Sequence, residues 1–451
     1  MMEKTKNFTQ GNPAKLLLFF ALPLMVGNLF QQMYTLVDTI IVGQGVGVEA
    51  LASLGASEWL CWLFFGLATG FTQGFSILFS QYYGAGKYED LKKTIGNALV
   101  LSAAAVCLMV FCGQLMIAPA LRLLKTPENI FAGSELYLRI LWAGIPITLL
   151  YNFASALLRA LGDSKTPLIA MVVAALVNIG LDLLFVMGFH WGIAGAAGAT
   201  LFAQGCALLA CLWAMKSLDC VHISRKHAAP EKDILKRLLI LGVPVMFQNT
   251  IISVGGMVVQ SVVNGFGFLF VAGFTATNKL YGLLEVAATS FGYAITTYVA
   301  QNYGAGNYER IEKGIRSGII ISSVTALTIS ALMLIFGKAI LSLFVSGDPA
   351  QTGQVLDIAR HYLNIMSYFL IVLYALYVYR SGLQGLGNTV IPMLSGLAEF
   401  IMRVTAAIIF PRFLGQEGIF YAEILAWTGA AVLLAVSYYV VIGRKRQRSA
   451  H

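Results

Sequence analysis

Long apolar stretches separated by short polar segments run through the whole chain. Twelve of them can be placed, at 15–43, 53–80, 95–119, 134–158, 166–189, 194–216, 238–263, 268–300, 317–345, 359–384, 389–411 and 420–442. A helix needs about 20 consecutive apolar residues to cross the hydrocarbon core of a membrane. The pattern therefore predicts an all-α polytopic membrane protein with twelve transmembrane helices.

The predicted spans form two similar halves. Three motifs of the first half recur in the second, at offsets of 221, 220 and 225 residues: 22–25 as 243–246, 81–89 as 301–309, and 159–167 as 384–392. A repeat with unchanged orientation is typical of several transporter folds. We therefore expect two pseudo-symmetric six-helix bundles, an N-lobe over 1–217 and a C-lobe over 238–451, joined by a cytoplasmic connector at 218–237.

The composition supports a membrane protein. Only 11% of the residues are charged and 58% are hydrophobic, whereas soluble domains carry roughly 25% charged residues. The net charge of +9 does not indicate nucleic-acid binding, because most basic residues gather in alternate loops and at both ends of the chain, Arg380 being assigned to the loop after the tenth span. By the positive-inside rule both termini and the connector are cytoplasmic, and we expect a monomer, surrounded by lipid, in a bacterial inner membrane.

Polar residues inside the predicted spans of the first half are the candidate site. Asp38 follows Pro23, a residue expected to kink the first span, while Asn178 and Asp182 share a face of the fifth span and Asn152 lies in the fourth. An ionisable group in hydrocarbon is costly and is a functional candidate by default. Carboxylate and amide oxygens suit Na⁺, and two neighbouring carboxyls can instead share a proton. A hydrogen-bonded clamp between helices is the structural alternative.

The second half does not repeat these polar positions. Val259 stands where the repeat would place Asp38. Glu399 and Arg403 are four residues apart in the eleventh span and are expected to pair with each other in a structural role. Glu285 in the eighth span either lines a substrate cavity or is structural. The ion chemistry is therefore predicted to lie in the first half.

Other residues have weaker patterns. Four residues are candidates for lining a substrate cavity, with ordinary core packing as the alternative: Gln31, Tyr34, Met171 and Thr200. The Gly-Ala-Gly sequences at 84–86 and 304–306 fit the C-terminal turns of helices. No arrangement of Ser, His, Asp or Cys suggests catalysis, so we expect neither an enzyme nor a cofactor other than a coupling ion.

Taken together, the motifs resemble those of multidrug and toxic compound extrusion (MATE) transporters. They are the proline and aspartate of the first span, the Gln-x-x-Gly-Ala-Gly sequences at 81–86 and 301–306, the segment 159–163, and the Asn-x-x-x-Asp sequence at 178–182. The resemblance implies two six-helix bundles that form a V-shaped cavity. It also implies export of cationic or amphipathic drugs or metabolites in exchange for H⁺ or Na⁺ by alternating access.

The resemblance further implies roles for single residues. The cation site would consist of Asp38, Asn178, Asp182, Asn152 and Tyr137, and Gln31 would face the substrate. The seventh and tenth spans carry no acid, so the coupling resembles that of the DinF-like branch more than that of the NorM-like branch. The alternative function is a flippase for lipid-linked precursors, but such proteins often have fourteen spans and a cationic cavity. The substrate and the choice between H⁺ and Na⁺ stay open.

Overall fold

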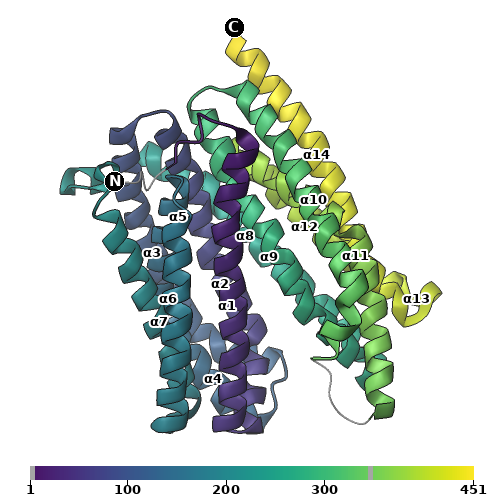
Figure 1. The fold of residues 1–451 in the computed structure, drawn as a ribbon. Helices are drawn as coiled ribbons and strands as arrows, with labels where there is room; N and C mark the ends of the chain where they lie inside the picture. Colours follow the sequence, from purple (N-terminus) through teal and green to yellow (C-terminus); the bar gives the residue numbers. More distant parts are fainter. Residues whose placement is uncertain (1–5, 344–348, 451) are drawn as a thin grey trace. The chain divides into compact units, whose positions relative to one another are not determined.

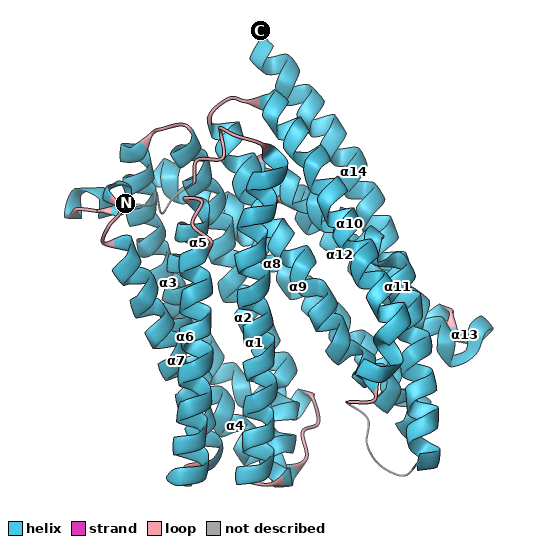
Figure 2. Ribbon diagram, viewed as in Figure 1, coloured by secondary structure: helices cyan, strands magenta, loops and turns pink. Residues whose placement is uncertain are grey.

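A computed structural model of the chain describes residues 6–343 and 349–450, and all regular structure in these two ranges is helical (Figure 2). The α-helices, labelled in Figure 1, are α1 Pro13–Gly45, α2 Val48–Gly84, α3 Tyr88–Leu123, α4 Glu128–Ala143, α5 Ile145–Ala160, α6 Lys165–Asp182, α7 Gly192–Met215, α8 Lys232–Val263, α9 Phe268–Gly304, α10 Tyr308–Leu341, α11 Pro349–Gly385, α12 Val390–Ile409, α13 Pro411–Leu414 and α14 Phe420–Ala450. The all-α prediction is confirmed.

The helices account for the predicted spans. Among the described residues nine helices are long and apolar enough to cross a membrane, or ten if α4 and α5, which meet at an angle of 51°, form one bent span. α9 is not among these nine helices. Val390–Gln447 is one of the nine, although it contains both α12 and α14. Including α9 and dividing this stretch at α13 gives the predicted twelve.

The helices form two compact units, which are described separately. Unit 1 contains residues 6–7 and Leu22–Met246, and unit 2 contains Phe8–Ala21 and the residues from Phe247 onward. The expected N-lobe and C-lobe divide the chain once, at the connector. The two units are instead defined by which residues pack together, so their boundaries fall inside α1 and α8. Each of these helices passes from one unit to the other close to an internal proline, Pro23 in α1 and Pro244 in α8.

The Gly-Ala-Gly sequences end α2 and α9, as predicted. The last helical residues are Gly84 and Gly304. Two residues later Gly86 and Gly306 have φ angles of 69° and 74°. This left-handed conformation favours glycine, and it allows the following amides to bond the last carbonyls of the helix.

A close approach of two helices within unit 1 depends on a second pair of glycines. A Cβ atom added to Gly74 of α2 would lie 2.7 Å from both the Gly242 nitrogen and the Leu241 carbonyl oxygen of α8. These are backbone atoms, so a rotamer change cannot relieve the collision. Small residues at helix crossings in membranes allow this kind of approach.

We therefore expect Gly74→Ala to destabilise the protein by about 1–3 kcal/mol, the usual cost of overpacking. Gly55→Ala in the same helix is the matched control, because a Cβ there meets no atom within 4 Å. Thermal unfolding in detergent measures both variants. Equal melting temperatures for the two variants would contradict the close crossing at Gly74.

Candidate functional site

Two buried carboxyl groups from different helices form the centre of the site in unit 1. Asp38 of α1 is 7% exposed and Asp182, the last residue of α6, is 0% exposed. The two carboxyls lie close enough to interact electrostatically and to share a hydrogen bond when one of them carries a proton. When both are ionised, neither can donate to the other. Asp38 Oδ1 and both Asp182 oxygens have no hydrogen-bond partner among the described residues. Burial of ionised carboxylates without partners is unfavourable, so the pair favours binding of a proton or a cation.

Asn178 adds an amide on the same side of α6. It lies four residues before Asp182, which places both side chains on one face of the helix. The residue is 1% exposed, and neither Asn178 Oδ1 nor Asn178 Nδ2 has a hydrogen-bond partner within the described part of the chain. Its oxygen is therefore available as a further ligand.

Two tyrosines lie in the electrostatic neighbourhood of the carboxyls. Tyr34, one turn before Asp38, makes a side-chain hydrogen bond with Gln31 and interacts with both aspartates. Tyr137 of α4 interacts with the same two aspartates. Both tyrosines therefore lie within electrostatic range of the carboxyl pair. Tyr34 had been a candidate for the substrate cavity, and the family resemblance had implied that Tyr137 belongs to the cation site.

The remaining predicted residues of unit 1 are less closely tied to this group. Asn152 donates to the Thr148 carbonyl of its own helix at 2.9 Å. No hydrogen bond among the described residues joins it to either aspartate. Met171 lies against α1, since a Cβ on Gly27 would be 2.9 Å from the Met171 sulfur. Thr200 is partly buried on α7. The roles given to these residues stay predictions.

A π-helix directly after Asp182 was not predicted. It covers Leu183–Gly188 and is formed by an apolar sequence that carries no signal against an ordinary α-helix. Its central Val186 is buried in an apolar cluster, together with Ile41, Val42, Ala50 and Ala196. Val42 and Val186 each follow one of the two aspartates by four residues. Dry packing therefore borders the carboxyl pair along both helices, and π-helices are frequent at functional sites.

In unit 2 the buried charges pair differently from the prediction. Glu399 of α12 pairs with Arg380 of α11, and Arg403 pairs with Glu423 of α14 at 3.0 Å. The predicted pair of Glu399 with Arg403 is therefore wrong. Tertiary packing places a closer partner beside each residue than the one four positions away in the same helix.

Three charged residues of unit 2 lie within helices, Arg380 in α11, Glu423 in α14 and Glu285 in α9. Arg380 is 7% exposed within α11, so its assignment to a loop was also wrong. Glu423, at the start of the last span, was not considered, although an acid at the end of an apolar stretch was a visible signal. Glu285 of α9 accepts a hydrogen bond from the Tyr377 hydroxyl of α11. It therefore has a partner, and the arginines nearby are paired with other acids.

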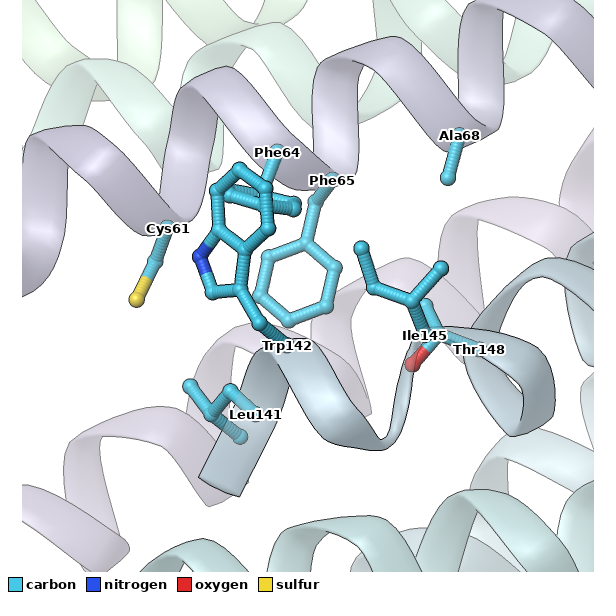
Figure 3. A pocket seen from close by; sticks show the side chains of 8 residues that line it. All are labelled: Cys61, Phe64, Phe65, Ala68, Leu141, Trp142, Ile145 and Thr148. Carbon is cyan, nitrogen blue, oxygen red and sulfur yellow. The ribbon is translucent and has the colours of Figure 1, made fainter. Parts of the chain in front are cut away.

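A small pocket lies beside the bend between α4 and α5 in unit 1 (Figure 3). It is lined by Cys61, Phe64, Phe65 and Ala68 of α2 and by Leu141, Trp142, Ile145 and Thr148 of α4 and α5. The lining is aromatic and aliphatic except for the Cys61 thiol and for Thr148, whose hydroxyl donates to Gln204. No predicted site residue lines this pocket, and it carries no charged group.

The donor set limits which cations the aspartates could bind. Within the described ranges no group of three or more His, Cys, Asp or Glu side chains could hold a metal ion. The polar groups described near the aspartates are the two carboxyls, the Asn178 amide and the hydroxyls of two tyrosines. Such ligands suit a proton or a hard cation such as Na⁺ better than a transition metal.

Comparisons with known proteins agree with this architecture. The MatE family profile matches residues 23–184 and 244–409, one segment in each half. The chain is 31% identical to the probable multidrug resistance protein YpnP of Bacillus subtilis (strain 168), over 92% of each chain. It is 28% identical to the probable multidrug resistance protein YoeA of the same strain, over 95% of this chain and 94% of that relative.

A solved structure shows the same fold. The crystal structure of MATE in complex with MaL6 matches with a TM-score of 0.91 at 24% identity, over 98% of this chain and 99% of that chain. At this identity the likeness concerns the fold alone.

Proposed function

Since this chain belongs to the MatE family, we propose that it is a multidrug efflux transporter of a bacterial inner membrane. It exports cationic or amphipathic drugs or metabolites by secondary active antiport with H⁺ or Na⁺. Both termini lie in the cytoplasm and the protein acts as a monomer surrounded by lipid. The multi-pass helical fold and the multidrug resistance relatives support this proposal.

The observation that carries the proposal is the pair of buried carboxyls without hydrogen-bond partners among the described residues, Asp38 and Asp182. A proton or Na⁺ bound there removes the cost of two like charges in a low dielectric. Na⁺ would be held by both aspartates and the Asn178 oxygen, with the Tyr34 and Tyr137 hydroxyls nearby. A proton would be shared within the pair, which then titrates as a unit.

Exchange follows from competition between the ion and the substrate. Antiport requires only that each is bound less well when the other is bound. We assign the ion to Asp38, Asn178 and Asp182, with Asn152 and Tyr137 as further ligands. We assign substrate contact to the other predicted residues, which are Gln31, Tyr34, Met171, Thr200 and Glu285.

We propose that ion coupling uses residues of the first half only, as in the DinF-like branch. The acids of unit 2 support this assignment, because Glu399 and Glu423 are paired with arginines. No observation favours the flippase alternative. The polar groups around Asp38 in unit 1 are acidic or neutral, whereas a carrier of anionic lipid-linked precursors would need a cationic interior.

Efflux from proteoliposomes tests the proposal. We expect a cationic dye such as ethidium to be transported only when a proton or sodium gradient is imposed, and the effective gradient identifies the ion. Collapse of the gradient with an ionophore should stop transport. Gradient-independent dye movement, or movement of lipid-linked precursors without dye transport, would contradict antiport.

A further inference from the structure

We infer that Gln301, Asn302 and Arg310 anchor the N-terminal segment of the chain to unit 2, and that they act as positioning residues for the ion response of α1. The inference deepens the proposed antiport and rests on it. It also gives a role to the second Gln-x-x-Gly-Ala-Gly sequence, which begins with Gln301 and is not explained by the end of a helix alone.

The anchor holds the backbone of the segment before α1. The Phe8 amide donates to Gln301 Oε1 at 2.9 Å. The Phe8 carbonyl accepts hydrogen bonds from Asn302 Nδ2 at 3.1 Å and from an Arg310 terminal nitrogen at 3.0 Å. The other terminal nitrogen of Arg310 donates to the Gly11 carbonyl at 3.0 Å. Both polar backbone groups of Phe8 are therefore satisfied by side chains of α9 and α10.

The ring of Phe8 strengthens this attachment. It is 0% exposed. It packs edge-on against Phe20 and Tyr298, with ring centroids 5.2 Å and 6.0 Å apart. Burial of a phenylalanine side chain and charge-assisted hydrogen bonds to backbone carbonyls are both substantial contributions. The segment is thus fixed by apolar and polar contacts together.

Arg310 is itself held in place. Its Nε donates to Asn302 Oδ1 at 3.1 Å, so the amide that bonds Phe8 also orients the guanidinium. The Arg310 carbonyl accepts a hydrogen bond from the Tyr298 hydroxyl at 3.0 Å. A planar guanidinium with several fixed donors suits two carbonyls, and the single ammonium of a lysine would not replace it.

The corresponding segment of the second half is anchored in the same manner. The connector before α8 lies on α3 in unit 1, where Asn97 Oδ1 accepts the Glu231 amide at 2.8 Å and Asn97 Nδ2 donates to the Ala229 carbonyl at 3.2 Å. Lys93 pairs with Glu231 at 3.0 Å. The first helix of each half therefore starts on the unit built mainly from the other half.

The two ends of α1 belong to different units. Phe8–Ala21 belongs to unit 2, and the remainder, which carries Asp38, belongs to unit 1. In the proposed antiport, a movement of α1 that accompanies ion binding at Asp38 would act against a segment that is fixed to unit 2. Pro23 lies next to the residue where α1 passes from one unit to the other. Without the anchor the carboxyl pair would still bind its ion, but the movement would not reach unit 2.

Arg310→Gln is the test, with Lys313→Gln as its control. Lys313 lies in the same helix, and among the described residues it pairs only with the exposed Glu309. Hydrogen–deuterium exchange is measured for 13–21 and 32–45 at high and low proton or sodium concentration. We expect about ten- to hundredfold faster exchange over 13–21 in Arg310→Gln. Ion-dependent protection of 32–45 should remain, while gradient-driven efflux falls about tenfold. The control should match the wild type.

Each other outcome has a defined meaning. Unchanged exchange over 13–21 overturns the anchor, and fast exchange with normal efflux overturns its positioning role. Loss of protection over 32–45 shows a general structural defect instead and also overturns the inference. If the wild-type protein shows no gradient-driven efflux, the proposed function fails. The anchor is then tested only by whether hydrogen–deuterium exchange over 13–21 is faster in Arg310→Gln than in the wild type. Should Arg310→Gln not fold, Phe8→Leu is measured in the same way.

Discussion

Asp38→Asn is expected to abolish ion-driven efflux and to leave the protein folded. The amide has the shape of the carboxyl but cannot release a proton or carry the charge that attracts a cation. Asp182 then has no second carboxyl beside it, so the reason for the pair to take up an ion disappears. Asp182→Asn should impair transport strongly for the same reason. Asn178→Ala should weaken the apparent ion affinity by roughly tenfold, because it removes one oxygen ligand.

Transport in proteoliposomes under imposed proton and sodium gradients measures this series. Thr39→Val is the matched control. Thr39 is the neighbour of Asp38, and its hydroxyl donates to the Thr35 carbonyl of the same helix at 2.9 Å. We expect the control to transport like the wild type. Undiminished gradient-driven efflux by Asp38→Asn would refute the proposed role of the carboxyl pair.

Glu399→Gln is expected to damage folding more than coupling. It leaves the Arg380 guanidinium buried without its counter-ion, and breaking a buried pair in this way costs about 3–5 kcal/mol. Expression and thermal stability should therefore fall sharply. A double variant, Arg380→Met with Glu399→Leu, removes both charges and should recover much of the lost stability, because apolar residues of similar volume often replace a buried pair well.

An exposed acid in the first turn of α10 is the control for this prediction. Glu309→Gln breaks the surface pair with Lys313 and should change stability little, since exposed pairs are weak. Stability and ion dependence are measured on Glu399→Gln protein purified from the membrane. If Glu399→Gln is as stable as the wild type and has lost its ion dependence specifically, the paired acids of unit 2 take part in coupling.

Much of the fold could be predicted because the signals are local. Apolar stretches determine the spans, and glycines with positive φ determine the turns after Gly84 and Gly304. The i, i+4 spacing of Asn178 and Asp182 fixes a common face on one helix. Asp38 could be added to them because a carboxyl in an apolar span needs a polar environment. The structure places its carboxyl beside that of Asp182.

The rest depends on contacts between helices that no local pattern contains. The spacing of Glu399 and Arg403 would suit a pair within α12, yet side chains of α11 and α14 reach them instead. The π-helix after Asp182 has an ordinary apolar sequence, and its buried Val186 packs against residues of other helices. Nothing in the first residues of the chain indicates that Phe8 is buried against α9 and α10.

The anchor at Phe8 also constrains how the protein is made. The hydrogen bond between Phe8 and Gln301 joins residues 293 positions apart. Synthesis proceeds from the N-terminus and chain segments fold as they emerge, so α1 enters the membrane long before α9 and α10 exist. Phe8 therefore stays without its hydrogen-bond partners until the chain has been made beyond Gln301. A chain interrupted before Gln301 has the part of α1 that belongs to unit 1, but it lacks the α9 and α10 side chains that hold Phe8.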